Sequence, residues 1–337
     1  MQFLKLILPE TIINSMNKKF SLKKEESLAH LSAIDIPPAL KITFKDINDL
    51  KRKVHNKDLK KFYDTLTFEM DDYNFPYMHE NLKTLRIYPI YIKNPKFLRR
   101  KVAAYYNCIK NIVRYTKDEK DKVLPHELLH MASTVKRDED ESIFSGFSQS
   151  TKLGNYELLA RGINEGYTQL LAERYYKVGY NSYPLEVLII SKLEDIVGQQ
   201  KMERMYFEAD LKGLTNELLN YMDEKSIIMF MYAVDFLGTL YCQTDITQDF
   251  SWIKKSYYYV VEFLMNIKVQ KIKEEENNFN SAKRELNEFI QGFQYKIVNK
   301  KTNEDIIILD KFVIENMMNK YINEFKDFYI FNSKKHV

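Results

Sequence analysis

The chain has 337 residues, of which 45% are hydrophobic, enough for a substantial core and too many for a disordered protein. Its 51 basic and 47 acidic residues are interleaved and leave a net charge of +4, so nothing points to nucleic acid or an anionic membrane as a partner. The 2 cysteines argue against a disulfide framework and exclude a cysteine-rich zinc site, so any metal must rely on histidines and carboxylates.

Nothing at the N-terminus resembles a secretory signal. The opening MQFLKLILPETIINS is a short apolar run with one lysine, broken by Pro9-Glu10, and it has no convincing cleavage site. No window approaches the roughly 18 apolar residues of a membrane span. We therefore expect a cytoplasmic protein, with export by a signal-independent route left open.

The rarity of glycine and proline, 9 and 8 residues, predicts a mainly helical α+β protein. Three regions are expected: a mixed N-terminal region over 1–84, a central region over 85–180 with a small sheet before its main helix, and a mainly helical C-terminal region over 181–337. In the first region, apolar residues at helical spacing predict a helix over 46–70, and a shorter amphipathic helix is expected over 18–28.

The sheet is predicted from two stretches rich in β-branched and aromatic residues, LRIYPIYI (85–92) and the segment 102–115. The end of the second stretch, NIVRY (111–115), alternates loosely and is expected to be a half-buried edge strand. The polar TKDEKDK (116–122) is predicted to be a loop. A helix should follow from Val123 or Leu124 to about Lys136, with Pro125 in its first turn, where a missing N–H costs little.

Downstream, a loop or hairpin is predicted over 145–155, and a second helix from Ile163 to about Tyr176. From Pro184 onward the pattern is mostly helical. A hairpin is expected over 295–309, where two β-rich arms flank polar residues, and the charge-rich 271–288 is expected to be one long solvated helix.

The stretch LPHELLH carries the clearest chemical signal of the sequence. His126 and His130 are four positions apart, so on a helix they share a face, one turn apart, and both imidazoles can reach one metal ion. Glu127 is turned about 100° round the helix axis, where its carboxylate can reach a metal-bound water without being a ligand. This is the physical content of the H-E-x-x-H pattern, which predicts a zinc site with Glu127 as general base.

A catalytic zinc needs a third protein ligand, and Glu165 in ARGINEGYTQLLAERYY (160–176) is the preferred candidate. It lies in the first turn of the second predicted helix, beside small residues that allow a close approach to the first. Glu157 and Glu173 are rival ligands, each eight positions from Glu165. The other histidines are isolated and are interpreted as ordinary surface or core residues.

HELLH followed by INEGYTQLLAERYY resembles the zincin metallopeptidases, specifically the gluzincin type, whose third zinc ligand is a glutamate on a second helix. The resemblance covers roughly 102–176. It implies a peptidase with zinc held by His126, His130 and Glu165. It also implies a sheet whose edge strand, for which NIVRY is the candidate, lies beside the substrate cleft and binds an extended peptide.

The chain departs from the gluzincin pattern at Gln169, where several members have an aspartate that orients a histidine ligand. Either the neutral amide of Gln169 suffices, or another carboxylate such as Glu173 or Asp138 takes the role. For stabilising the charge on the scissile carbonyl, Tyr167 is the preferred candidate.

Tyr206 and Arg161 are the other candidates for that charge-stabilising role, and each of the three residues has a packing role as its alternative. The expected activity is zinc-dependent hydrolysis of a peptide or protein substrate. Two alternatives stay open: a catalytically inactive zinc-binding interaction protein, and a regulatory protease with one partner substrate.

Overall fold

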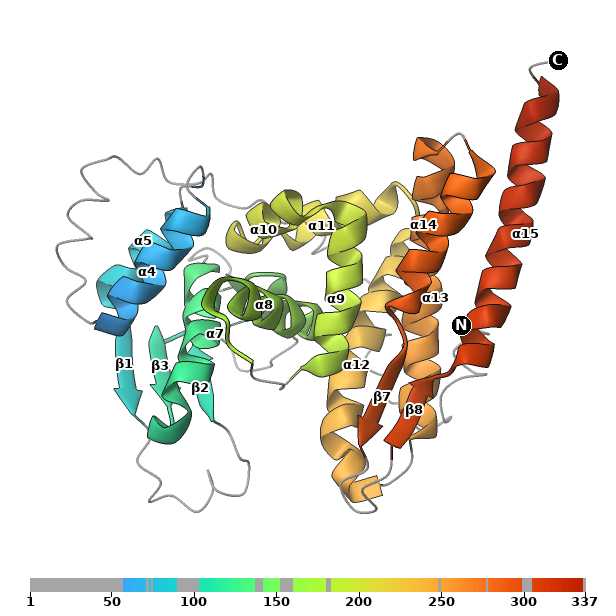
Figure 1. Ribbon diagram of the computed structural model, residues 1–337. Helices are drawn as coiled ribbons and strands as arrows, with labels where there is room; N and C mark the ends of the chain where they lie inside the picture. The colour runs from blue at the N-terminus through green and yellow to red at the C-terminus, as the bar shows by residue number, and fades with distance from the viewer. Residues whose placement is uncertain are drawn as a thin grey trace. The chain divides into compact units, whose positions relative to one another are not determined.

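The computed structural model describes residues 57–70, 73, 75–89, 103–136, 142–151, 160–179, 183–247, 250–276, 278–298 and 305–335. These residues form a mainly helical α+β structure with small sheets, as predicted (Figure 1). The helices predicted over 18–28 and at the start of 46–70 lie outside the described residues. Among the described residues, no helix is long and apolar enough to cross a membrane.

The chain divides into two compact units, one within Ile36–Ile190 and Gly198–Leu214 and the other including Ser191–Val197 and Thr215–Val337. The first is called the site unit here and the second the helical unit. The three regions expected from the sequence stay a prediction.

The site unit begins with two helices, α4 (Lys57–Glu69) and α5 (Pro76–Thr84), and a three-stranded sheet. The strands are β1 (Arg86–Pro89), β2 (Ala104–Asn107) and β3 (Ile112–Tyr115), in the order β1-β3-β2. β1 is parallel to β3, with Arg86 opposite Ile112, and β2 is antiparallel to β3, with Tyr106 opposite Val113.

The expectation that NIVRY is an edge strand is wrong, because β3 lies in the centre of the sheet, paired on both sides. Ile112 and Val113 are buried, as suits a β-branched pair in a central strand. In the described part of the chain, the strand beside the motif helix that pairs on one side only is β2.

The motif helix α7 runs from Lys120 to Ala132, after a 3₁₀ turn at Lys117–Glu119. It starts earlier than predicted, so TKDEKDK is not a loop and Pro125 lies inside the helix rather than in its first turn. The early start is stabilised by an ion pair between Lys120 and Asp58 of α4.

α7 also ends earlier than predicted, because the next residues turn back onto its last carbonyls. Ser133 Oγ donates to Leu129 O at 3.1 Å and Thr134 Oγ1 donates to His130 O at 2.6 Å. Such hydroxyls compete with the helical ladder and favour its termination. The residues predicted to extend the helix instead form strand β4 (Thr134–Lys136).

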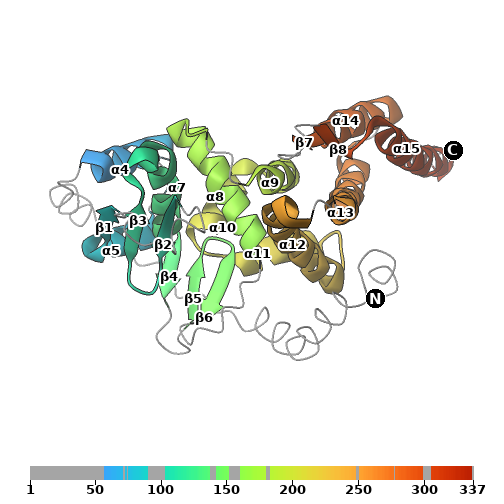
Figure 2. The ribbon, with the colours of Figure 1, turned by 90° about the horizontal axis from the view of Figure 1, so that it is seen from below.

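Strand β4 pairs with a β-hairpin, β5 (Ser142–Ser145) and β6 (Ser148–Thr151), as Figure 2 shows. Over 145–151 the hairpin confirms one of the two options predicted for 145–155, and 152–155 lie outside the described residues. The second ligand-bearing helix, α8 (Arg161–Tyr176), packs against α7, and α4 packs on α8 through a stack of Phe62 on Tyr176. The site unit also includes the first part of α9 (Pro184–Val197), up to Ile190, and the whole of α10 (Gln199–Phe207).

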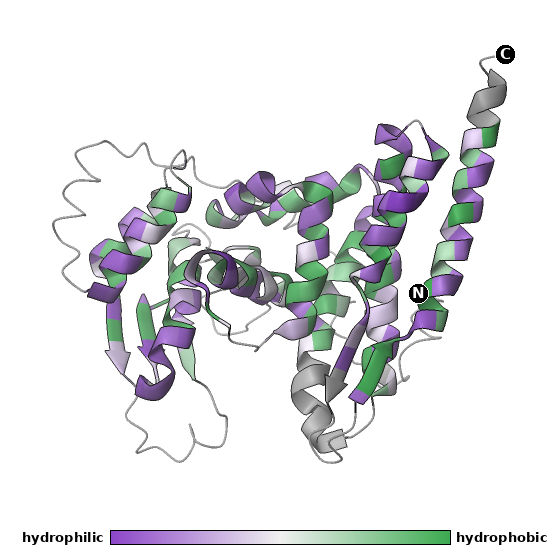
Figure 3. Ribbon diagram, viewed as in Figure 1, coloured by the Kyte–Doolittle hydropathy of each residue, from purple (hydrophilic) through white to green (hydrophobic). Residues whose placement is uncertain are grey.

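The helical unit is built mainly from long helices and one hairpin. Its described elements are the part of α11 (Leu211–Leu219) that follows Leu214, then α12 (Glu224–Thr247), α13 (Ser251–Glu275), α14 (Phe279–Gln291), β7 (Tyr295–Val298), β8 (Asp305–Leu309) and α15 (Lys311–Lys335). Phe230 of α12 stacks on Phe263 of α13, with ring centroids 4.4 Å apart. Figure 3 shows hydrophobic and hydrophilic residues alternating along α14 and α15, the pattern of helices with one buried face.

The hairpin predicted over 295–309 is confirmed by the antiparallel pairing of β7 and β8.

The prediction of a single long helix over 271–288 is wrong. α13 ends at Glu275, and Asn278 caps a new helix by accepting a hydrogen bond from the Asn280 N–H at 2.8 Å. An asparagine at this position satisfies a free N–H of the first turn and so favours a new start.

Candidate metal centre

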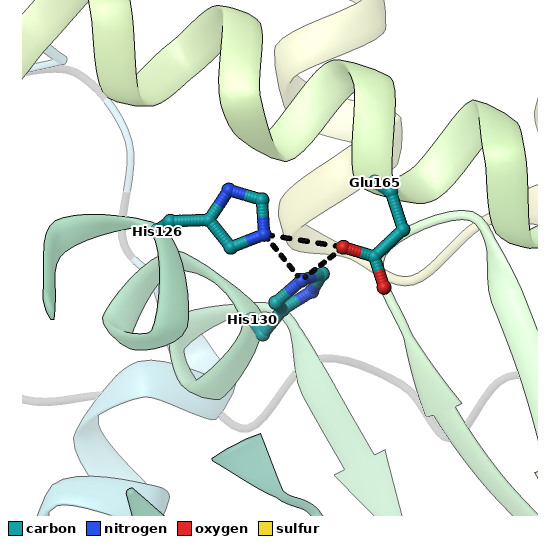
Figure 4. A group of neighbouring side chains, drawn as sticks. All are labelled: His126, His130 and Glu165. Atoms are coloured by element: carbon teal, nitrogen blue, oxygen red, sulfur yellow. Dashed lines mark hydrogen bonds and ion pairs between the residues drawn. The ribbon is translucent and has the colours of Figure 1, made fainter. Parts of the chain in front are cut away.

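His126 and His130 project from the same face of α7, as their spacing predicts (Figure 4). Their Nε2 atoms lie 3.1 Å apart, and both side chains are buried. The following helix α8 brings Glu165 to the same point. Its Oε2 atom lies 3.1 Å from His126 Nε2 and 3.3 Å from His130 Nε2. The structure therefore brings together the three predicted ligands.

Three atoms at these separations could surround one tetrahedrally coordinated metal ion. Two ligands each about 2.0–2.1 Å from a tetrahedral ion lie about 3.3 Å from one another. Hydrogen bonding alone does not account for the arrangement. If both Nε2 atoms donate to Glu165, two N–H groups also face each other across 3.1 Å. A cation between the three atoms resolves this conflict, so the His126, His130 and Glu165 group can hold a metal ion.

The electrostatics of Glu165 suit a metal ligand. Burial raises the pKa of this carboxyl, but the charge of His130 and hydrogen bonds from both histidines outweigh that effect and hold the pKa well below its ordinary value. The carboxylate is therefore available as an anionic ligand. Arg161, one turn earlier on α8, is mostly exposed, with its Nε 3.8 Å from Glu165 Oε1.

Each imidazole has a hydrogen-bonding neighbour at its second nitrogen, as metal-binding histidines usually do. His126 Nδ1 lies 3.2 Å from Gln169 Oε1, and Gln169 Nε2 donates to Glu173 Oε1 at 3.0 Å. Gln169 therefore occupies the orienting position, with Glu173 behind it. The other carboxylate considered for this role, Asp138, lies outside the described residues.

The second nitrogen of His130, Nδ1, lies 3.4 Å from Thr168 Oγ1 and 3.3 Å from Asn164 Nδ2. The threonine hydroxyl donates its own proton to Asn164 O, so its oxygen can accept a proton from Nδ1, whereas the Asn164 NH₂ group can only donate a hydrogen bond to Nδ1. The amide oxygen of Asn164 accepts from the Phe147 N–H at the tip of the β5–β6 hairpin. Nothing in the sequence pattern pointed to this link between the hairpin and the ligand helix.

Glu127 is 9% exposed and lies on α7 next to the first ligand. Burial raises its pKa to about 7; the nearby Glu165 adds to the rise, while His126 and a hydrogen bond from the backbone of Tyr106 oppose it. Tyr106 belongs to β2, so this bond ties the edge of the sheet to the site. A buried carboxyl with a pKa near neutrality is suited to accepting and returning a proton.

Tyr183 is the residue of the site that sequence reasoning missed. Its ring stacks on the His126 imidazole, with centroids 5.7 Å and planes 14° apart. The charge of Glu165, followed by burial, raises the pKa of Tyr183 well above its ordinary value. The group therefore stays a neutral O–H donor beside the ligand cluster.

Tyr183 reaches this place because α9, which begins directly after it, crosses α8 closely. A Cβ added to Gly166 would lie 2.8 Å from the backbone carbonyl of Glu186 in α9. We expected Gly166, as a small residue, to let α8 approach α7 closely. In the structure, Gly166 instead lets α8 approach α9 closely.

The predicted charge-stabilising residue Tyr167 lies elsewhere in the unit. Its side chain is 0% exposed, and its ring packs among Phe147 and Tyr206. Tyr206 is also fully buried, with its hydroxyl 2.7 Å from Thr168 Oγ1. A catalytic role for Tyr167 stays a prediction, and among the described tyrosines it is Tyr183 whose ring stacks on a candidate metal ligand.

The isolated histidines were interpreted as ordinary residues, and His79 is the described one. It is buried, with its ring nitrogens 2.9 Å from Phe75 O and 3.2 Å from the Tyr63 hydroxyl. The rival ligand Glu157 lies outside the described residues. Glu173 faces Gln169, so of the described candidates Glu165 is the one placed with both histidines.

Comparison with known proteins yields no match among protein-family models, curated proteins or solved structures.

Proposed function

We propose that this chain is a zinc-dependent peptidase of the gluzincin type. The observation that carries the proposal is the convergence of His126 Nε2, His130 Nε2 and Glu165 Oε2 at separations of 3.1 to 3.3 Å. Glu127 lies buried directly beside them. Two imidazoles and one carboxylate, drawn from an H-E-x-x-H helix and the next helix, form a donor set typical of catalytic zinc in peptidases.

The number of ligands supports a catalytic rather than a structural site. Structural zinc sites use four protein ligands, whereas catalytic sites use three and keep one position open. The group found in the described residues has three. When bound, zinc would lower the pKa of a coordinated water and polarise the scissile carbonyl.

Glu127 would supply the proton transfers of the hydrolysis. Its carboxylate takes a proton from the attacking water and passes it to the leaving nitrogen, so that the acyl carbon gains a hydroxyl and the amine gains a hydrogen. Burial raises its pKa to about 7, which matches both halves of this task near neutral pH. Glu127 directly follows His126 in the sequence, so helix α7, which carries His126 and His130, also fixes the position of Glu127.

Tyr183 would stabilise the negative charge that develops on the carbonyl oxygen. A neutral hydroxyl next to Glu165 is a preorganised donor, which is the usual means of stabilising such a charge. The stack on His126 fixes the plane of its ring. Tyr183 takes over here the role for which Tyr167 was the candidate.

The proposed substrate is a peptide or protein that adds as a strand to β2. This strand is linked to Glu127 through the backbone of Tyr106, and among the described residues it pairs only with β3. An extended peptide on the free edge would gain main-chain hydrogen bonds. We therefore propose that β2 (Ala104–Asn107) binds the extended substrate, a role that was first expected of NIVRY.

The proposal is tested with protein loaded with one equivalent of zinc and incubated with a proteome-derived peptide library. Mass spectrometry should show new termini that form with zinc and not after chelation. Zinc bound at one per chain, with no cleavage of the library or of proteins from the same cells, would favour the inactive zinc-binding alternative. Cleavage of one protein only would favour the regulatory protease.

A further inference from the structure

A surface groove of about 630 Å³ lies between α14 and α15 of the helical unit, which pack side by side (Figure 2). Ile314, Met318 and Ile322 of α15 line one side of it. They are spaced four residues apart and therefore form one apolar stripe along the helix. Ile314 and Met318 are buried, so this stripe is the floor of the groove. The volume is in the range of ligand-binding sites.

The other side of the groove is a polar stripe of α14. Its members are all exposed: Asn280, Lys283, Arg284, Asn287 and Gln291. Because each residue turns the helix by about 100°, the whole stripe lies within an arc of about 100° around the helix axis. The buried apolar residues of α14 lie outside this arc. The stripe therefore presents amides and cations together to one hollow.

The charges of the two helices are separated by side. Lys283 and Arg284 line the groove, and neither has an ion-pair partner within the part of the chain that the structure describes. Glu285, the next residue, does not line the groove and pairs with a lysine of α13. The carboxylate among the described lining residues, Glu315, is paired within α15, with Lys311 Nζ 3.6 Å from its Oε1. The groove therefore carries a surplus of positive charge that suits an anionic occupant.

The amides of the stripe suit a peptide backbone, because each offers a carbonyl acceptor and an NH₂ donor, as the backbone itself does. Asn287 and Gln291 are one helical turn apart, about 6 Å along the axis, close to the roughly 6.6 Å between alternate residues of an extended chain. Gln291 Nε2 donates to Asn287 Oδ1 at 3.5 Å, and the Asn287 NH₂ group donates to no acceptor within the described residues. From Asn280 to Gln291 the stripe is about 16 Å long, enough for about five extended residues.

We propose that this groove binds an extended, acidic peptide segment of another protein. Alternate side chains of an extended chain point to opposite sides. Carboxylates on one side pair with Lys283 and Arg284, apolar side chains on the other lie on the stripe of α15, and the backbone bonds to the amides. A single-stranded nucleic acid fits less well, because none of the described lining residues is an aromatic on which its bases could stack. The inference does not depend on the metal centre.

The probe is a capped, fluorescent peptide of alternating glutamate and leucine, about six residues long to match the stripe. Its binding to the full chain is followed by fluorescence anisotropy, and mass spectrometry checks that it stays intact. A peptide with lysine in place of glutamate controls for charge. We expect the acidic peptide to bind about tenfold more tightly than the basic one, and its affinity to fall as salt is added.

Lys283→Glu/Arg284→Glu reverses the charge of the α14 stripe. We expect this variant to bind the acidic peptide about tenfold more weakly than the wild type does, and the basic peptide more tightly. A gain of binding cannot arise from misfolding. Lys254→Glu/Lys255→Glu is the matched control, because it changes the net charge equally at two adjacent exposed lysines of α13 that do not line the groove. The control should keep the preference for the acidic peptide.

Methylation of the backbone nitrogens of the acidic peptide tests whether the amides bind its backbone. It should weaken binding to the wild type about fivefold, the effect of losing about one hydrogen bond. Asn280→Ala/Asn287→Ala should bind the methylated and unmethylated peptides almost equally, because the remaining amide oxygen of the stripe on α14, Gln291 Oε1, already accepts from Gln294 at 2.7 Å.

The inference is overturned if the wild type binds the acidic and basic peptides alike, or if Lys283→Glu/Arg284→Glu keeps the wild-type preference. Equal binding of the methylated and unmethylated peptides by the wild type would contradict the contact with an extended backbone. An oligothymidylate of about ten nucleotides that binds more tightly than the acidic peptide would make the groove a nucleic-acid site instead.

Discussion

The ring of Tyr183 lies parallel to the imidazole of His126, with centroids 5.7 Å and planes 14° apart, so a tyrosine is held against a candidate metal ligand. Tyr183→Phe keeps this stack and removes the hydroxyl. We expect kcat to fall about 10²–10³-fold, the usual effect of losing one donor to the developing charge. Zinc affinity should change little, because the hydroxyl is not among the three ligand atoms.

Tyr167→Phe is the matched comparison for that prediction, since it removes a hydroxyl from the neighbouring aromatic cluster. Steady-state kinetics on one peptide identified from the library, with zinc content measured in the same samples, compares the two variants. A larger loss of kcat in Tyr167→Phe would assign the donor role to Tyr167. Unchanged kcat in both variants would show that neither hydroxyl stabilises the transition state.

Glu127→Gln should abolish most turnover while zinc stays bound. The amide keeps the shape of the side chain but can no longer take a proton from water, a contribution of about 10²–10⁴-fold. Glu127 is not in the ligand group, so zinc stoichiometry should stay at the wild-type value. A variant that turns over at the wild-type rate would refute the general-base role, and one that loses zinc would make Glu127 a ligand.

Glu165→Ala should weaken zinc binding by orders of magnitude, because it removes one of three atoms that converge at 3.1 to 3.3 Å. The rival carboxylates are the controls. Glu157→Ala should bind zinc normally, and Glu173→Ala should lose far less affinity than Glu165→Ala, since Glu173 contacts Gln169. Chelator competition ranks the three variants. Normal zinc binding by Glu165→Ala would show that another residue is the third ligand and would remove the main support for the gluzincin type.

The convergence of the three candidate metal ligands could be predicted from the sequence because their placement is mostly local. His126 and His130 share a face through the geometry of one helix, and Glu165 sits near the start of the next. The mainly helical α+β fold followed from composition and periodicity. The β7–β8 hairpin was marked by polar residues between two β-rich arms, whereas 145–155 was predicted only as a loop or a hairpin.

The errors came from contacts between segments far apart in the chain. The order of strands in a sheet is not encoded in the pattern of one strand, so the central place of β3 was missed. Tyr183 reaches His126 only because Gly166 lets α9 cross α8 closely. The ends of α7 depend on Lys120 pairing with Asp58 and on Thr134 bonding back to His130, neither of which has a periodic signature.

Gly146→Ala tests whether the β5–β6 hairpin supports the ligand helices. Gly146 has a φ of +54°, and an added Cβ would lie 2.2 Å from Asn164 Oδ1 and 2.4 Å from the Tyr206 ring. Left-handed backbone costs an L-residue about 1–2 kcal/mol, and the two contacts add to that cost. We expect the free energy of unfolding to fall by about 2 kcal/mol or more.

The displaced Asn164 should also affect the metal centre, because its amide lies 3.3 Å from His130 Nδ1. Zinc affinity of Gly146→Ala should therefore fall along with stability. Gly179→Ala is the control, since a Cβ there meets nothing within 4 Å. Denaturant unfolding and chelator competition on both variants separate the effects. A Gly146→Ala protein as stable as Gly179→Ala would show that the hairpin tip tolerates a side chain, and lower stability with unchanged zinc affinity would show that the hairpin supports the fold but not His130.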